Sequence, residues 1–266
     1  MKDFTDDAVS PSGALAHFAA DFDLGRVPAE TVERAKICLL DALGIGLASA
    51  GSDYGASLAS ALADLGGTGD FPVIGSRLTL SQRDSAHLNG TLIHGLDFDD
   101  THTEDVVHTS ASAAPTMLSA GLAAKADGAR ALAAFILATE VAARIGVSAR
   151  GGFHENGFHP TGVCGAFGAA VASGYLLGLN AEQLVSAQGI VSSKASGLLE
   201  FLSDGAWTKR NHPGWASVAG QTAAAMAGRG FFGPQRPYDG RYGLFAAPML
   251  RPIRPSIVRR RRRGPY

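Results

Sequence analysis

Apolar residues recur along the chain at the spacing of an α-helix. The clearest series follows Pro28 at steps of three and four residues: Val32, Ala35, Leu39, Leu43 and Leu47. Side chains at these steps lie on one face of a helix, and proline is common in a first helical turn. The pattern therefore predicts an amphipathic helix that begins at Pro28 and ends near Gly51.

Turn and capping residues divide the rest of the chain into further helices. Ser81 with Asp84 resembles a capping box and predicts a helix over 82–94, and Asn180 with Gln183 marks a start that runs toward residue 193. Thr161 is a candidate cap for an uncharged helix over 161–181. The other predicted helices cover 56–65, 115–126, 129–149 and 213–228, and residues 71–76 form a loop with at most a short strand.

The fold class follows from what this pattern lacks. Helices do not alternate with apolar strands, which argues against a doubly wound sheet, and no repeat of fixed period is present. The 34 glycines among 266 residues favour helices that approach one another closely. We therefore expect an all-α, multi-helix fold. The run 161–181 is long enough to raise the question of a membrane span, but its glycines and polar residues favour a buried helix, so no membrane association is expected.

Composition and charge exclude several classes of protein. With 46% hydrophobic and 18% charged residues, the chain is not disordered. Residues 251–266 hold seven arginines and no acid, so residues 1–250 carry 16 basic against 24 acidic side chains, a net charge of −8. Such a body should not bind nucleic acid, because that binding depends on Lys and Arg. Two separated cysteines, Cys38 and Cys164, and an acidic start without a secretory signal predict a cytoplasmic protein.

Polar residues gather in four places, all at predicted helix ends or in loops, where functional groups are common. These are HGLDFDDTHTEDVVH (94–108), GFHPTG (157–162), WTKRNHPG (207–214) and the pair Asp204 and Trp207. The first could hold a metal ion, as in a metal-dependent hydrolase, because carboxylates and imidazoles are common ligands. However, His94 and His102 are eight residues apart across a predicted helix end, unlike an HExxH site. The alternative is a solvated acidic loop in which Glu104 and Asp105 cap helices.

Six segments together resemble the MmgE/PrpD family, which includes 2-methylcitrate dehydratase and cis-aconitate decarboxylase. They are LLDALGIGLASAG (39–51), NGTLIHGLDFDDTH (89–102), HTSASAAPTMLSA (108–120), EVAARIG (140–146), GFHPTGVCGAFGAA (157–170) and KRNHPGWASVAG (209–220). The resemblance runs in order from about residue 10 to about residue 250. It implies an all-α domain that carries most of the site, a smaller α+β lid domain and a homodimer.

The resemblance also implies which residues form the site. The Asp-Phe-Asp-Asp-Thr pattern and the following histidine fall on Asp97, Thr101 and His108, with one extra residue between Thr101 and His108 relative to the decarboxylase pattern. The remaining family positions fall on His159 and Lys209, with His212 beside the lysine. Asp97, His108, His159 and Lys209 are therefore expected to be catalytic, and Thr101 and His212 to bind substrate.

Lyase chemistry on a small di- or tricarboxylic acid gives each residue a role. Lys209 would hold a carboxylate, and His108 and His159 would orient the acid and exchange protons, for which an imidazole suits neutral pH. Asp97 would act as a base or set the tautomer of an imidazole, and Thr101 would donate a hydrogen bond to the acid. Two cysteines cannot hold an iron–sulfur cluster, so we expect metal-free acid–base catalysis without a cofactor.

The end of the chain departs from the resemblance, which implies roughly as much chain again. Residues 251–266 match nothing expected of the family, and their arginine run is typical of an aberrant reading frame. We therefore expect a helical domain over 1–250 with the lid absent, an aberrant tail over 251–266, and impaired activity. The alternatives are a non-catalytic remnant or a metal-dependent hydrolase that uses the Asp- and His-rich loop.

Overall fold

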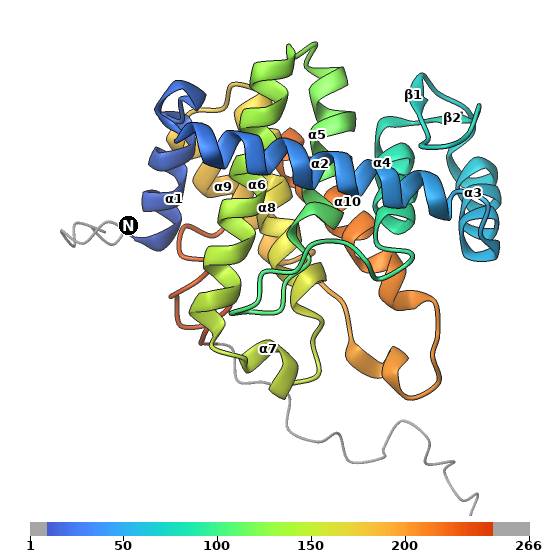
Figure 1. Cartoon of the computed structure of the whole chain (residues 1–266). Coiled ribbons are helices and arrows are strands. Elements are labelled where there is room, and N and C mark those ends of the chain that lie inside the picture. Colours follow the sequence, from blue (N-terminus) through green and yellow to red (C-terminus); the bar gives the residue numbers. More distant parts are fainter. Residues whose placement is uncertain (1–9, 247–266) are drawn as a thin grey trace, which may run out of the picture.

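The computed structural model describes residues 10–246, and within them the predicted all-α fold is confirmed. The helices in Figure 1 are α1 (Pro11–Ala20), α2 (Ala29–Ser49), α3 (Asp53–Gly66), α4 (Gln82–Ile93), α5 (Thr109–Ala123), α6 (Gly128–Ala149), α7 (Gly152–Glu155), α8 (Pro160–Leu176), α9 (Ala181–Ser192) and α10 (Thr208–Gly228). Two short 3-10 helices cover Leu24–Arg26 and Leu199–Leu202. Strands β1 (Phe71–Pro72) and β2 (Thr79–Leu80) form one small antiparallel hairpin. The tail at 251–266 lies outside the described residues.

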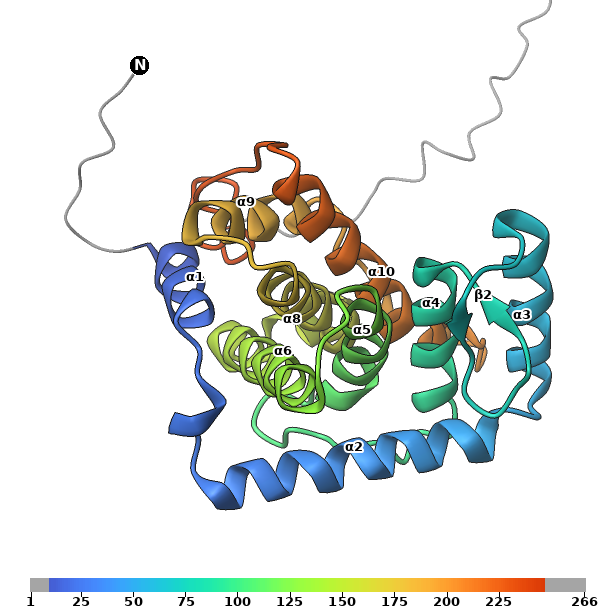
Figure 2. The same ribbon diagram turned by 90° about the horizontal axis from the view of Figure 1, so that it is seen from above.

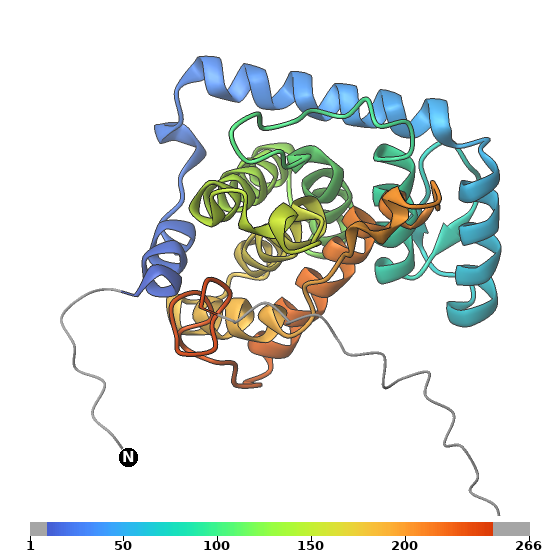
Figure 3. The same ribbon diagram turned by 90° about the horizontal axis from the view of Figure 1, so that it is seen from below.

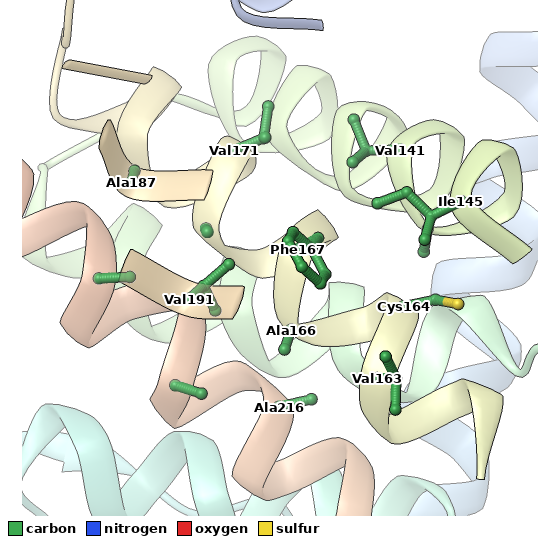
Figure 4. Close-up of a cluster of buried hydrophobic side chains, with 14 of the residues drawn as sticks. Val141, Ile145, Val163, Cys164, Ala166, Phe167, Val171, Ala187, Val191 and Ala216 are labelled. Carbon is green, nitrogen blue, oxygen red and sulfur yellow. The ribbon is translucent and has the colours of Figure 1, made fainter. Parts of the chain in front are cut away.

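The core surrounds α8, which contacts α5, α6, α9 and α10. Figure 4 shows Phe167 of α8 directed toward Val141 and Ile145 of α6, and all three side chains are buried. Glycine allows this closeness: a Cβ atom at Gly168 would lie 2.4 Å from the carbonyl oxygen of Ala138. Small residues thus bring α8 against α6, as the composition predicts.

Helix α2 lies along one edge of the bundle. Figures 2 and 3, from opposite sides, show it running beside α6 and α5, across the direction of these helices, toward α3 and the small hairpin. The predicted helix is confirmed, but Pro28 is its N-cap and not its first residue. The predicted apolar face is wrong at Leu47, which is 59% exposed. Small residues such as Ala42 and Gly46 occupy the buried face, because α2 packs closely against Ile74 and Ile93.

Two predicted helix starts are wrong, because the prediction took a proline as the first residue of each helix. Helix α5 begins at Thr109, six residues before Pro115, and α10 begins at Thr208, five residues before Pro213. A proline usually marks a first turn because its missing N–H is not needed there, yet both prolines lie inside their helices. The extra turn of α10 matters for function, since Lys209 therefore lies on a helix.

The predicted caps were right at two helices and wrong at one. Ser81 accepts a hydrogen bond from the backbone N–H of Asp84 at the start of α4, and Asn180 and Gln183 form a capping box at α9. The start of α8 differs: His159 is the N-cap and Thr161 lies in the first turn. The hydroxyl of Thr161 does not cap α8, and it accepts a hydrogen bond from the backbone N–H of His108 instead.

One described helix, α6, is long and apolar enough by length and composition to cross a membrane. Helices α2 and α3 meet the same criterion only as a pair bent by 89°. The run considered from the sequence, 161–181, is not one helix: its residues up to Leu176 belong to the 17-residue α8, which is buried within the bundle, and Ala181 begins α9. A core helix also satisfies the criterion, and half of the tested stretch of α6 is buried against its neighbours.

Candidate active site

A cavity of about 440 Å³ lies where α4, α5, α8 and α10 meet. Asp97, His108, His159 and Lys209 all line it, although up to 112 residues separate them in the sequence. Hollows of about 560 and 700 Å³ elsewhere are lined without histidine or lysine. A further hollow of about 580 Å³ has one histidine, His102, beside Glu104 and Glu140. The 440 Å³ cavity gathers four histidines with Asp97 and Lys209, so of these hollows it is the best equipped for acid–base chemistry.

Helix starts surround this cavity. His108 is the N-cap of α5, His159 is the N-cap of α8, and Lys209 is the second residue of α10. The first turn of a helix carries unpaired backbone N–H groups and a partial positive charge, which favours anions. Together with the lysine, these helix ends suit the cavity to a small acid.

Close contact between α4 and α10 sets the width of the site. A Cβ atom at Gly90 would lie 2.6 Å from the Cα of Gly214, so neither position has room for a side chain. The two helices cross at these glycines. One turn beyond the crossing, α4 ends at His94, while Lys209 and His212 lie on the first turns of α10.

Lys209 pairs with Asp97 across the cavity. The ammonium nitrogen lies 2.5 Å from Oδ1 of Asp97, whose backbone adopts a left-handed conformation with φ of 59°. An aspartate tolerates that conformation better than most residues. Burial raises the pKa of Asp97, but the hydrogen bond and charge of Lys209 outweigh burial and bring the pKa below its ordinary value.

Asp99 pairs with His94 beneath the cavity. Both side chains are fully buried, and Nδ1 of His94 lies 2.9 Å from one carboxylate oxygen. The other ring nitrogen, Nε2, is buried without a hydrogen-bond partner among the described residues. Few native polar atoms are left in this state, so such an atom points to a functional constraint.

His108 joins the loop after α4 to the bundle. Its backbone N–H donates to Oγ1 of Thr161 over 3.1 Å, which links the starts of α5 and α8. Its Nδ1 atom lies 3.2 Å from Oγ1 of Thr101 and 3.3 Å from the backbone oxygen of Asp99. Burial is the main cause that lowers the pKa of the His108 imidazole.

His159 and His212 share a hydrogen bond between their Nδ1 atoms, 3.0 Å apart. His159 faces the main cavity, whereas His212 lines a second hollow of about 500 Å³ on the other side. Burial is the main cause that lowers the pKa of both rings, to about 4 for His212 and further for His159. Both imidazoles are therefore neutral near pH 7.

Asp100 and Asp105, two further acids of the loop, have structural partners. Asp100 accepts hydrogen bonds from the hydroxyl of Thr109 and the backbone N–H of Ser110, and so caps α5. Asp105 is buried and lies 2.7 Å from Nδ1 of His102, so its expected role as a solvated cap is wrong. The loop therefore combines specific pairs with an exposed acid, Glu104, and only this residue agrees with the interpretation as a solvated segment.

The structure brings together four of the six residues expected in the site. Asp97, His108, His159 and Lys209 line the cavity, while Thr101 and His212 contact His108 and His159 from behind. Three further residues of the site, His94, Asp99 and Arg210, lie in polar segments that the sequence analysis singled out, but no catalytic or binding role was predicted for them. His94 and Asp99 belong to the quoted HGLDFDD stretch, and its density of ionisable residues was a signal for them.

Four groups could hold a metal ion. Ligand atoms of His94, Asp97, Asp99 and His108 lie within 4.8 Å of one another. Three of them already have partners, because Lys209 binds Asp97 and the Asp99 carboxylate binds His94. An ion would have to replace both contacts, so the donor set fits a cation only after rearrangement.

Comparison with known proteins gives a consistent result. Residues 13–253 match the MmgE/PrpD N-terminal domain. The chain is 28% identical over 239 residues to a cis-aconitate decarboxylase-like protein, oryM, of Aspergillus oryzae, covering 87% of this chain and 49% of the relative. It is also 28% identical to the cis-aconitate decarboxylases of Aspergillus terreus and Homo sapiens, covering 87% and 88% of this chain and 48% and 50% of those relatives.

The chain spans about half the length of these curated relatives. The matched region includes each helix that borders the cavity, from α4 to α10. The chain therefore belongs to the MmgE/PrpD family, and its cavity lies in the part that corresponds to the N-terminal domain of that family.

Proposed function

We propose that this chain carries the acid–base site of a lyase that acts on a small di- or tricarboxylic acid. The observation that carries the proposal is the cavity in which Lys209 and the starts of three helices face neutral imidazoles. The lysine and the helix starts would hold carboxylates, while His108 and His159 would transfer protons. The decarboxylase names of the relatives support this reaction class.

Two reactions fit these groups. In a decarboxylation, the bond to one carboxylate breaks, CO2 leaves, and the remaining electron pair takes up a proton from an acid in the site, such as the Lys209 ammonium group. In a dehydration, a base removes a proton beside a carboxylate, and an acid protonates the hydroxyl group that leaves as water. The dehydration needs one group that accepts a proton and one that donates a proton, whereas the decarboxylation needs only a donor. His108 and His159 lie on two sides of the cavity, where a neutral ring can accept a proton and then return it.

The test is direct incubation of the purified chain with cis-aconitate and with 2-methylcitrate, followed by detection of CO2 and of the unsaturated product. Binding is measured in parallel by calorimetry. Release of CO2 or water from either acid supports the proposal. Failure of both acids to bind or react, under conditions in which the chain is folded, contradicts it.

A metal-dependent hydrolase is the second candidate, because four groups of the site could together hold an ion. Dialysis against EDTA separates the two functions. A lyase that works by acid–base catalysis alone keeps its turnover, whereas loss of turnover that a divalent ion restores would favour the metal enzyme.

Water access limits the activity expected of this chain by itself. The Asp97 side chain is 55% exposed, so the ion pair with Lys209 is open to solvent. Proton transfer is more effective in a site from which water is excluded. We therefore propose weak turnover by the 266-residue chain. Binding of a carboxylic acid without any turnover would instead favour the reading of a non-catalytic remnant.

We also propose that the protein forms a homodimer. Ile37, Leu40 and Leu47 on α2 are 57%, 71% and 59% exposed, and they lie on one helix at the edge of the bundle. Contiguous exposed apolar side chains are typical of protein interfaces. Light scattering gives the mass in solution. A dimer that becomes a monomer on Leu40→Glu supports the proposal, and a monomeric wild-type chain contradicts it.

A further inference from the structure

Asp99 has a different environment from the acids on either side of it in the site. Asp97 is half exposed and binds Lys209, and Asp100 caps α5. Asp99 is fully buried and faces two imidazoles, those of His94 and His108. Asp99 is closed to solvent, so its role must act through these two imidazole rings.

The contacts of Asp99 assign the hydrogen on the His94 ring. Nδ1 of His94 lies 2.9 and 3.1 Å from the two carboxylate oxygens. A carboxylate can only accept hydrogen bonds, so Nδ1 must carry the hydrogen. A buried carboxylate also requires such a donor, because it has lost its hydration.

The same reasoning applies to His108. Its Nδ1 atom lies 3.5 Å from Oδ2 of Asp99 and 3.3 Å from the backbone oxygen of that residue. Both are oxygens that only accept, and the nearby hydroxyl of Thr101 can accept as well. The hydrogen therefore lies on Nδ1. The other nitrogen, Nε2, lies on the side of Asp97, 3.8 Å from its Oδ1.

We propose that Asp99 is a positioning residue that holds His94 and His108 as their Nδ1–H tautomers, so that the Nε2 lone pair of His108 faces the cavity as a proton acceptor. The ring of His94, with its centroid 4.8 Å from that of His108 and 5.7 Å from that of His159, fills the space behind both. His94 thereby keeps the Asp99 carboxylate out of water. The proton-accepting role of His108 rests on the proposed lyase function, whereas the tautomers do not.

Nitrogen-15 spectroscopy of the full chain tests this assignment without any substrate. Long-range proton–nitrogen correlations distinguish Nδ1–H from Nε2–H rings, and His94→Gln and His108→Gln identify the two signals by their loss. Both rings are expected as Nδ1–H in the wild-type chain. An Nε2–H ring at either residue overturns the proposal, even if no further variant folds.

Two variants test whether Asp99 is the cause. Asp99→Ala removes both oxygens that face Nδ1 of His94, so this ring should leave the Nδ1–H state and the Nδ1–H population of His108 should fall. Asp100→Ala removes a neighbouring carboxylate that contacts neither ring, so both tautomers should persist. Unchanged tautomers in Asp99→Ala, or the same change in both variants, contradict the proposal.

Kinetics link the tautomers to the proposed reaction. If the chain turns over a carboxylic acid, Asp99→Ala should lower kcat by about 100-fold or more, the usual contribution of general acid–base catalysis, with little change in KM. An unchanged kcat overturns the role of Asp99 in catalysis. Absence of turnover in the wild-type chain counts against the lyase function. The assignment of the tautomers is then tested by the nitrogen-15 spectra alone.

Discussion

His159 and His212 face each other through their Nδ1 atoms, which lie 3.0 Å apart. Since one nitrogen must donate and the other accept, the rings carry their hydrogens in different places. A proton added to the accepting nitrogen would bring two N–H groups together and break the contact. The pair is therefore compatible with neutral rings, in agreement with the lowered pKa of both residues.

This pair predicts a loss of stability in acid. The unfolded chain binds a proton at each ring near pH 6.5, whereas folded His212 does so only near pH 4 and folded His159 at still lower pH. The stabilisation is complete above pH 6.5 and is lost as the pH falls below it, because the unfolded state binds more protons. We expect a loss of about 2 kcal/mol for each ring between pH 7 and pH 5, measured by urea unfolding.

A variant pair isolates the contribution of His212. His212→Asn removes one of the two rings, so its unfolding free energy should depend less on pH than that of the wild type. His17→Gln, on the exposed side of α1, is the matched control and should keep the wild-type dependence. Equal slopes in all three proteins would show that the histidine pair does not control the acid response.

Lys209→Ala should weaken the binding of cis-aconitate and leave the fold intact. A hydrogen bond to a charged group contributes about 1.5–3 kcal/mol, which corresponds to roughly a 10- to 100-fold higher Kd by calorimetry. The pair with Asp97 is partly solvated, so its loss should change stability by no more than about 1 kcal/mol. Lys36→Ala, an exposed site on α2, is the control for removal of a positive charge. A large drop in Tm for Lys209→Ala alone would make the lysine structural.

The fold class could be predicted because periodicity and capping are local properties. Ser81 and Asn180 cap the helices that their sequences indicate, since each bond joins residues three apart. The buried face of α2 could not be predicted in the same way. Which side of α2 is covered depends on α4 and the segment near Ile74, and close packing there favours Gly46 over a larger residue.

In the site, as in the fold, the residues in local motifs could be predicted from the sequence, whereas their contacts with distant residues could not. Asp97, His108, His159 and Lys209 were expected from the family resemblance, and the structure places them around one cavity. The partners of the loop acids were not predictable, because Asp97 binds a lysine 112 residues away. The three aspartates of one short motif thus have different partners: Asp97 binds a lysine, Asp99 faces two histidines, and Asp100 caps a helix. The fold determines these partners, and the spacing of the aspartates in the sequence does not.

The crossing of α4 and α10 provides a test of how packing controls the site. In Gly214→Ala, the new Cβ would lie 2.1 Å from the carbonyl oxygen of His87, so the helices must separate. We expect a loss of about 1–3 kcal/mol of unfolding free energy, as for other overpacked positions, and weaker binding of cis-aconitate because Lys209 moves with α10. Gly44→Ala on α2 is the matched control. Its Cβ would meet nothing within 4 Å, and alanine favours a helix over glycine, so this variant should gain about 0.5–1 kcal/mol. Equal stabilities of the two variants would show that the crossing tolerates a side chain, and that the glycine contact does not set the position of Lys209.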